Sequence, residues 1–465
     1  MGALMLLCGT LDGTTGDQPG HTFILLGVLT MSLGVATVLA TSNPTHRSLD
    51  RRQSFLLTAL VWIILPVFGA LPFVVGVPHA SLTDAYFESM SGMTTTGSTV
   101  FQGLDAMPAS VLLWRGILQW LGGLGIVIVA MIFLPIMRVG GMQFFLTEGF
   151  DTHGKILPRA LDIARSLLAV YVALTLACLL AYLAFGMSLF DALVHALTTI
   201  STGGFSTSDQ SFARFTGTLE YVSVVFMVLA SLPLIRFVQL GRGTPGPLLL
   251  DTQVRAYLKC IISACLMLVL YRGATSDAKL TDIVRETIFN LVTLISGTGY
   301  ASEDITEWGS FALVLGVLIG LAGGCTGSTA CSIKIFRWQV LWLAIQSQLR
   351  QFNHPNAVAG PKYGKRALSA DVVTSVAAFF TFFVLTLGLI AIALSLTGLS
   401  LRTSVTAAWT SVANIGPVYG QEVGASGSLG ALPSPAKWIM ILGMLAGRLE
   451  ILSLYVLFTL VFWVI

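Results

Sequence analysis

The chain has 465 residues, of which 55% are hydrophobic and only 10% are charged, and its formal net charge is +3. Soluble domains carry about 25% charged residues, so this composition excludes a water-soluble globular protein and indicates a surface that faces lipid. The small net charge gives no basis for nucleic-acid binding. The six cysteines form no CxxC pair and read mostly as small core residues rather than as a metal site or a disulfide framework.

The predicted elements begin with a short apolar stretch, Ala3 to Cys8. It cannot cross a bilayer, because a spanning helix needs about 20 apolar residues, and it lacks the basic flank of a signal peptide. We interpret it as the remnant of a shortened first helix. Nine long apolar segments follow and predict nine membrane crossings, at 22–41, 54–77, 111–137, 166–186, 216–238, 254–271, 308–346, 370–397 and 436–463.

The connecting segments predict the orientation, because Lys and Arg concentrate in cytoplasmic loops. One set of alternate loops holds 17 of the 25 basic residues and the opposite set holds seven, while Arg448 lies inside a span. The basic side is therefore predicted to be cytoplasmic. The outer side carries carboxylates that either attract cations to a pore mouth or simply reflect the exclusion of positive charge: Asp84, Glu88, Asp105, Asp191, Asp209, Glu220, Asp277, Asp282, Glu286, Glu303, Asp304, Glu307 and Glu422.

The outer loops contain a recurring pattern. Each has a short amphipathic stretch, near 81–90, 190–192, 282–287 and 401–404, which leads to a cluster rich in Thr, Ser and Gly. One glycine of each cluster recurs at intervals of roughly 100 residues, and such a period indicates a repeated architecture. Each unit reads as a span, a short re-entrant helix, a glycine-bearing turn and a second span. The recurring glycines are Gly97, Gly204, Gly299 and Gly416.

The chemistry of these clusters suits a cation pore. Irregular backbone at membrane depth is tolerated only where it is buried in protein or lines water, and inward-facing carbonyl oxygens can replace the hydration shell of an ion. Glycine and threonine in a single loop could merely punctuate a hairpin, but four such loops in register favour a filter. The predicted filter residues are Thr95, Thr96, Gly97, Gly203, Gly204, Thr298, Gly299, Asn414, Ile415 and Gly416.

These clusters resemble the filter segments of the Trk/Ktr/HKT superfamily of cation transporters, and most closely those of its TrkH branch. The resemblance rests on 94–99, 203–207, 298–300 and 414–417, and also on 120–125, 140–143 and 447–450. It covers nearly the whole chain from residue 22 onward. Members of the branch typically carry two additional N-terminal spans, whereas this chain supplies one and a remnant. Ala330-Cys331-Ser332 replaces a more glycine-rich stretch, and Val418 stands where many relatives have glycine.

The resemblance implies a multi-pass protein of the bacterial cytoplasmic (inner) membrane that takes up potassium through a single-chain, pseudo-fourfold pore. It implies assembly as a homodimer in lipid, with a cytosolic nucleotide-binding regulatory ring, TrkA, as partner. Potassium is then the transported substrate, and no organic cofactor is expected in this chain, which has no P-loop and no GxGxxG in a strand–helix context. In the family, glycine at all four filter turns goes with potassium, whereas serine at the first goes with sodium; position 97 is glycine.

An interruption in the seventh span predicts a gate. Gly323-Gly324-Cys325-Thr326-Gly327-Ser328-Thr329 would unwind a helical turn, since glycine disfavours a helix interior by about 1 kcal/mol relative to alanine. By resemblance this loop blocks the pore below the filter, although a static kink is the alternative. Arg448 is costly within a span; by resemblance it faces the loop and donates hydrogen bonds to loop carbonyls, and the alternative is a pair with Glu450.

Other candidates are less informative. His195 is expected to be packed in the second re-entrant helix rather than functional. Lys334 and Arg337 at the cytoplasmic end of the broken helix either contact the partner or anchor the helix at the membrane surface. Asp371 and the loop 348–369 are candidates for contact with the regulatory ring by position alone.

The predicted fold is therefore an all-α polytopic membrane protein with four span–pore helix–span repeats around a pore. We expect an N-terminal region at 1–53 and repeats at 54–138, 139–241, 242–347 and 348–465. The alternative functions are sodium or ammonium permeation by the same pore, and a cation-coupled solute transporter, although the spans lack the midplane carboxylates that a coupled transporter uses. An enzyme is not expected, because the six histidines are scattered and no nucleophile or metal cluster is visible.

Overall fold

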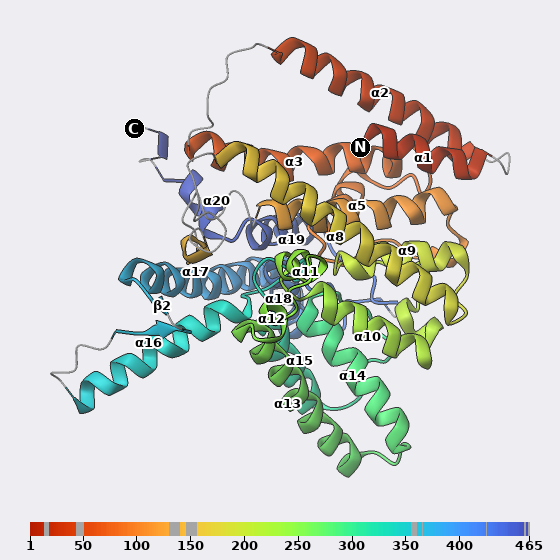
Figure 1. Cartoon of the computed structure of the whole chain (residues 1–465). Helices are drawn as coiled ribbons and strands as arrows, with labels where there is room; N and C mark the ends of the chain where they lie inside the picture. Colours follow the sequence, from red (N-terminus) through yellow and green to blue (C-terminus); the bar gives the residue numbers. More distant parts are fainter. Residues whose placement is uncertain are drawn as a thin grey trace.

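The computed structural model describes residues 1–13, 18–42, 51–129, 140–145, 156–354, 360–364, 366–424, 426–459 and 462–463. Within them the chain is almost entirely helical (Figure 1), and the one sheet is a two-residue hairpin, β1 (Lys362–Tyr363) and β2 (Arg366–Ala367). This hairpin lies within the segment that connects the third and fourth units, which the charge pattern predicts to be cytoplasmic. The predicted all-α polytopic fold is confirmed.

The N-terminal region is a helical pair. The short apolar stretch predicted from the sequence forms α1 (Gly2–Gly13), which packs along α2 (Gln18–Thr41). The two backbones approach closely, because a Cβ at Gly2 would lie 2.6 Å from the carbonyl oxygen of Gly27. Figure 1 shows α2 at the edge of the molecule, and many of its apolar side chains are exposed, as a lipid-facing helix requires.

The rest of the described chain consists of four units, each built from a long helix, a short helix and a second helical segment that is broken in the last three units. In chain order they are α3 (Arg51–Val75), α4 (Leu82–Met93) and α5 (Ala109–Ile128); α8 (Ile156–Ala184), α9 (Leu189–Ile200) and α10 (Thr218–Ala230) with α11 (Leu234–Gly241); α13 (Thr252–Thr275), α14 (Leu280–Ser296) and α15 (Ser310–Ala322) with α16 (Ile335–Asn353); and α17 (Ala370–Ser395), α18 (Leu401–Ala413) and α19 (Ser434–Arg448) with α20 (Leu452–Leu457). Short elements join them, namely η1 (Leu104–Ala106), η3 (Met142–Phe145), η4 (Ser211–Phe215) and α12 (Gly246–Leu249).

The short helices form the centre of the molecule. Most residues of α4, α9, α14 and α18 are buried, whereas the first helix of each unit exposes many apolar side chains. Three of the short helices begin at an equivalent serine, Ser81, Ser188 or Ser400, whose side chain accepts a hydrogen bond from the backbone N–H three residues later. Serine is a favoured N-cap because it satisfies a backbone donor that the helix leaves unpaired. The same local signal thus starts the same element in three units.

Six of the described helices are long and apolar enough to cross a membrane, and α10 with α11 forms a seventh candidate bent by 92°. The predicted span at 308–346 is interrupted, as expected, between α15 and α16. The predictions of continuous spans at 216–238 and 436–463 are wrong. The first breaks at Ser231-Leu232-Pro233, where proline cannot donate a helical hydrogen bond, and the second breaks after Arg448, where Glu450 and Ile451 have φ values of 59° and 48°.

Candidate ion-conduction site

Four turns follow the short helices and face one another. We call them turn 1 (Thr95–Gly97), turn 2 (Thr202–Gly204), turn 3 (Gly297–Gly299) and turn 4 (Asn414–Gly416). Each ends in a glycine with positive φ, between 79° and 112°. The first residue of each turn also has positive φ, including the non-glycine residues Thr95, Thr202 and Asn414 at 52° to 53°. All four units therefore repeat one backbone conformation that side chains rarely adopt.

The glycine that ends each turn lies against a backbone carbonyl of the next turn. That carbonyl belongs to the residue just before the glycine of the next turn. A Cβ on Gly97 would lie 2.1 Å from the Gly203 oxygen, and one on Gly204 would lie 1.9 Å from the Thr298 oxygen. The same contact joins turn 3 to turn 4, where Gly299 would meet the Ile415 oxygen at 2.1 Å, and joins turn 4 to turn 1, where Gly416 would meet the Thr96 oxygen at 2.8 Å. The contacts run from turn 1 through turns 2, 3 and 4 and return to turn 1, so the four turns form a closed ring around one axis.

The carbonyls of this ring differ in their partners. Among the described residues, no donor hydrogen-bonds the carbonyl oxygen of Thr96, Thr298 or Ile415, whereas that of Gly203 accepts a bond of 2.6 Å from Gln119 Nε2. Buried carbonyls normally have partners. Three oxygens of the ring are therefore available to a ligand on the axis.

The short helices add electrostatic support to the ring. The last residue of each short helix lies directly before a turn or one residue further upstream. These residues are Met93, Ile200, Ser296 and Ala413. The C-terminus of a helix carries a partial negative charge of about half an elementary charge. Four such termini surrounding one axis favour a cation there and disfavour an anion.

Turns 1 and 4 are cross-linked by side chains that are distant in sequence. Ser98 Oγ donates to the Gly416 carbonyl at 2.7 Å, and Asn414 Nδ2 donates to Thr96 Oγ1 at 2.9 Å. Thr410 Oγ1 accepts from the Gly416 N–H at 2.7 Å. These bonds hold turns 1 and 4 in their positive-φ conformation.

A buried ion pair lies behind turns 1 and 2. Arg115 Nε is 2.8 Å from Glu88 Oε1, and both side chains are at most 1% exposed. Glu88 also accepts from the Val100 N–H at 2.9 Å, and Arg115 donates to the Ser206 carbonyl at 3.0 Å and lies over the Phe205 ring. Glu88 is therefore a clamp on the segments that follow the turns, and its predicted place on an acidic outer rim is wrong.

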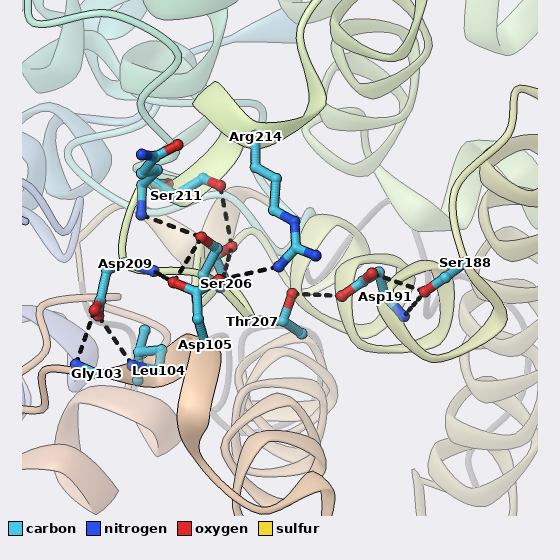
Figure 2. A network of polar contacts seen from close by, with 12 residues as sticks. Gly103, Leu104, Asp105, Ser188, Asp191, Ser206, Thr207, Asp209, Ser211 and Arg214 are labelled. Atoms are coloured by element: carbon cyan, nitrogen blue, oxygen red, sulfur yellow. Dashed lines mark hydrogen bonds and ion pairs between the residues drawn. The ribbon is translucent and has the colours of Figure 1, made fainter.

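The outer loops of the first two units interlock through carboxylates (Figure 2). Asp209 accepts from the N–H groups of Gly103 and Leu104 at 2.8 and 3.1 Å, while Asp105 accepts from the Asp209 N–H and from Arg214 at 3.2 and 3.0 Å. Figure 2 also shows Asp191 between Thr207 and Ser188, to which it is hydrogen-bonded. These hydrogen bonds lower the pKa of Asp191 despite its partial burial. These acidic residues connect loops as well as contributing negative charge.

The broken helix of the third unit places a buried loop between α15 and α16. Residues 323–331 are all buried, and the non-helical stretch extends to Lys334, beyond the predicted 323–329. The loop is held at the break between α10 and α11, where Leu234 N–H donates to Gly327 at 3.0 Å and Cys325 N–H donates to Ser231 at 2.9 Å. Thr329 Oγ1 donates to the Ile200 carbonyl at 3.0 Å, at the end of α9. The loop therefore lies directly beneath the ring.

Arg448 lies at the last residue of α19 and is 3% exposed. Its Nη1 donates to Cys331 Sγ and its Nη2 to the Gly122 carbonyl, both at 3.1 Å. The contact with the loop was expected, but the acceptor is a thiol rather than a carbonyl of 323–329. Glu450 does not pair with it, since Glu450 forms its ion pair with Arg337.

Arg337 and Lys334 are 1% and 4% exposed. Arg337 also donates to the carbonyls of Gly140 and Ile333 at 3.0 Å and lies over the Phe379 ring. The prediction that these two residues contact a partner or anchor the helix at the surface is therefore wrong. Arg337 instead joins α16 to the break between α19 and α20.

His195 is packed, as expected. Its ring lies among Phe212, Phe215 and Tyr300, and its nitrogens contact the Asp191 carbonyl at 2.8 Å and Ser206 Oγ at 3.0 Å. Packing and hydrogen bonding account for the position of this side chain.

Two residues of the site were not predicted from the sequence. Gln119 contacts turn 2 and the residue after it through both ends of its side-chain amide. Its Nε2 donates to the Gly203 carbonyl, and its Oε1 accepts from the Phe205 N–H at 3.0 Å. An amide in an apolar span is costly unless it has a partner, so Gln119 could have been found. Cys331 was interpreted as core packing, and no sequence signal marks it apart from its place beside the broken helix.

The chain was compared with known families, proteins and structures. The family model described as "TrkH: Cation transport protein" matches residues 20–236 and 254–462. The Trk system potassium uptake protein TrkI of Halomonas elongata is 41% identical over 94% of this chain and 90% of its own length. The Trk system potassium uptake protein TrkH of Escherichia coli K12 is 34% identical over 99% and 95%.

The fold has a close match among crystal structures. The potassium transporter TrkH from Vibrio parahaemolyticus superposes with a TM-score of 0.91 at 31% identity, over 99% of this chain and 96% of the other. The family match covers most of the chain, the relatives align over nearly their whole length, and the structural match spans 99% of this chain. The chain therefore belongs to the TrkH family of cation transport proteins.

Proposed function

We propose that this protein carries potassium into the cell across the cytoplasmic membrane, through the ring formed by turns 1 to 4. The observation that carries the proposal is the closed set of glycine–carbonyl contacts from Gly97 to Gly203, Gly204 to Thr298, Gly299 to Ile415 and Gly416 to Thr96. Backbone oxygens that face one axis can replace the hydration shell of a monovalent cation. The predicted filter residues Thr95, Thr96, Gly97, Gly203, Gly204, Thr298, Gly299, Asn414, Ile415 and Gly416 all lie in this ring.

The choice of potassium rests on two supports. The relatives in Halomonas elongata and Escherichia coli are named as potassium uptake proteins. Glycine ends all four turns, which is the pattern associated with potassium in the family that the sequence resembles. Sodium or ammonium permeation through the same ring is the alternative. Flux measurements with potassium, sodium and ammonium distinguish these possibilities.

The loop at 323–334 and Arg448 are proposed to gate the ring from the cytoplasmic side. The loop is buried, lies under the turns and is held by hydrogen bonds rather than by helical continuity. The glycines at 323 and 327, with φ of 68° and 77°, allow backbone angles that other residues resist. Such a loop can change position without unfolding the helices on either side.

We propose a homodimer that works with a cytosolic TrkA-like nucleotide-binding ring, and four repeats bounded at 54–138, 139–241, 242–347 and 348–465. The support for the partner is that the relatives are named as parts of a Trk system. The cytoplasmic face offers α16, the hairpin β1–β2 and Asp371 as positions where a partner would dock.

The test is ion flux in vesicles that contain the purified protein. Potassium and rubidium should enter faster than sodium, ammonium or caesium, and a cytosolic partner with its nucleotide should increase the rate. Expression should also restore growth of potassium-uptake-deficient cells at low potassium. If sodium or ammonium enters as fast as potassium, the potassium assignment is wrong; if no cation enters, the conduction role is wrong.

A further inference from the structure

One of the four ring carbonyls is held by a side chain of α5. Gln119 Nε2 donates to the Gly203 oxygen at 2.6 Å, and Gln119 Oε1 accepts from the Phe205 N–H at 3.0 Å. The orientation of the amide follows from its partners, because a backbone carbonyl can only accept and a backbone N–H can only donate. Gln119 therefore bridges the two peptide groups on either side of Gly204, the glycine that ends turn 2.

Two glycines of α5 bring Gln119 to this position. Gly116 and Gly123 lie on the same face of α5 as Gln119, because residues three or four apart are neighbours on a helix surface. A Cβ on Gly116 would lie 3.3 Å from Val194 Cγ1 in α9, and one on Gly123 would lie 2.8 Å from Ser201 Cβ, directly before turn 2. The small residues let α5 approach α9 closely, so the fully buried Gln119 side chain reaches the turn.

The contact makes the ring unequal. Among the described residues, the carbonyls of Thr96, Thr298 and Ile415 accept no hydrogen bond, whereas that of Gly203 does. A carbonyl oxygen has two lone pairs, so the Gly203 oxygen can bond Gln119 with one and still face an ion with the other. The ring therefore combines three oxygens that are free to adjust with one that is tethered.

A tethered oxygen discriminates between ions of different size. The attraction between an oxygen and a cation grows as their separation shrinks, so a small ion such as sodium gains most when the oxygens move inward. Selectivity is attributed either to the size of the cavity or to the field strength of its carbonyls. The bond from Gln119 acts in the same direction in both cases, because it restrains the oxygen from moving inward and its N–H weakens the negative potential there. Both effects favour the larger ion.

We propose that Gln119 is a positioning residue that sets the preference of the ring for potassium over sodium. The inference rests on the proposed conduction through the ring and names a residue that controls its selectivity. Gln119 acts through the Gly203 carbonyl and does not itself touch the ion. Arg115, on the same face of α5, donates to the Ser206 carbonyl at 3.0 Å and steadies the segment that follows the turn.

Tracer uptake of rubidium and of sodium, measured in parallel vesicles, tests the proposal with two variants. Gln119→Met keeps the length of the side chain but neither hydrogen bond, and Gln119→Asn keeps the amide but is one methylene too short to reach Gly203. The variants differ in volume and polarity and share the loss of the tether. In both, sodium uptake should rise, and the preference for rubidium over sodium should fall by about tenfold, the factor that corresponds to one hydrogen bond.

Thr175→Val is the matched control. It removes a buried hydrogen bond of 3.1 Å from Trp120 Nε1, the residue after Gln119 on α5, and it touches no turn. Its ion preference should equal that of the wild type. A preference in both Gln119 variants equal to that of Thr175→Val would overturn the proposal, and so would a fall of rubidium and sodium uptake in equal proportion, because that result assigns Gln119 to packing alone.

Ion binding to the purified protein in detergent provides an arm that does not depend on flux. An ion that binds the folded state raises the melting temperature. Potassium should raise that of the wild type more than sodium does, and the difference should shrink in Gln119→Met; an unchanged difference would contradict the role of Gln119. Wild-type vesicles that take up neither ion would instead count against the proposed conduction, while the melting curves would still report the ion preference of the ring.

Discussion

Single residues in this molecule are constrained mainly by how closely one turn approaches the next. Glycine at 97, 204, 299 and 416 was recognisable from the sequence, because the cluster recurs in every unit. The reason for glycine became visible only with the neighbouring carbonyls, which come from turns about a hundred residues away. Gln119 and Cys331 escaped prediction for the same reason, since their partners Gly203 and Thr95 are distant in sequence.

Gly204→Ala tests the steric requirement of the ring. The added Cβ would lie 1.9 Å from the Thr298 oxygen, so turns 2 and 3 must separate and potassium uptake should fall at least tenfold or lose its preference over sodium. Gly186→Ala is the matched control, because Gly186 has a similar positive φ of 93° but no atom within 4 Å of an added Cβ. Equal uptake and ion preference in both variants would remove Gly204 from the filter.

Arg448→Ala tests the proposed gate. Loss of the guanidinium removes both the hydrogen bond to Cys331 and a positive charge near the axis, so basal uptake should rise by about tenfold or more. Uptake without activation, normalised to the amount of folded protein in the vesicles, is the measurement. A fall in both basal and activated uptake with unaltered folding would assign Arg448 to packing.

At the level of elements, hydropathy predicted where the helices are but not where they stop. The spans at 22–41, 54–77 and 370–397 correspond to α2, α3 and α17, because an uninterrupted apolar run favours an uninterrupted helix. The break after Ala230 contains Pro233, which hydropathy does not register as a helix breaker, and the break after Arg448 depends on the positive φ of Glu450 and Ile451. Only the break that begins at Gly323 was predicted from the sequence, because three glycines occur close together there.

The N-terminus of α18 gives a prediction about pH. Glu422, in the outer loop, accepts hydrogen bonds from Thr403 Oγ1 and from the N–H and Oγ of Ser400, the N-cap of α18. These bonds lower the pKa of Glu422 from 4.5 to about 2. Because the folded pKa lies below the unfolded one, the stabilisation is complete above about pH 5 and is lost as the pH falls toward 2.

Glu422→Gln should therefore lower the melting temperature of the protein in detergent at pH 7, and the difference from the wild type should shrink steadily between pH 5 and pH 2. Melting curves of both proteins across this range are the measurement. A difference that stays constant with pH would show that the carboxylate charge contributes nothing to the cap.

At the scale of the whole molecule, four units of one chain are held in register by contacts that cross unit boundaries. The fourfold architecture was predictable because each unit repeats the same local signals: a short amphipathic helix, a glycine turn and a flanking apolar span. The cross-links were not, since charges such as Glu88 and Arg115 looked like ordinary members of the outer loops. Their burial places them in the scaffold that positions the ring.

Glu88→Gln tests this scaffold. It leaves Arg115 as an uncompensated buried charge, and removal of one partner of a buried pair typically costs about 3–5 kcal/mol. Asp162→Asn is the control, because the Arg165–Asp162 pair is 4.0 Å apart and more than 70% exposed, and such pairs contribute about 0–1 kcal/mol. Thermal unfolding in detergent should separate the two variants clearly, and similar melting temperatures would contradict the clamp.

The central claim is that the ring of turns 1 to 4 binds and passes potassium, and the most direct test is to locate the ion. Experimental density maps should be obtained from protein prepared in potassium or rubidium and from protein prepared in sodium alone. We predict a peak on the axis, within coordinating distance of the oxygens of Thr96, Thr298 and Ile415, that strengthens with rubidium and is weak in sodium. An empty axis in all three salts, or an ion bound elsewhere in the molecule, would contradict the account.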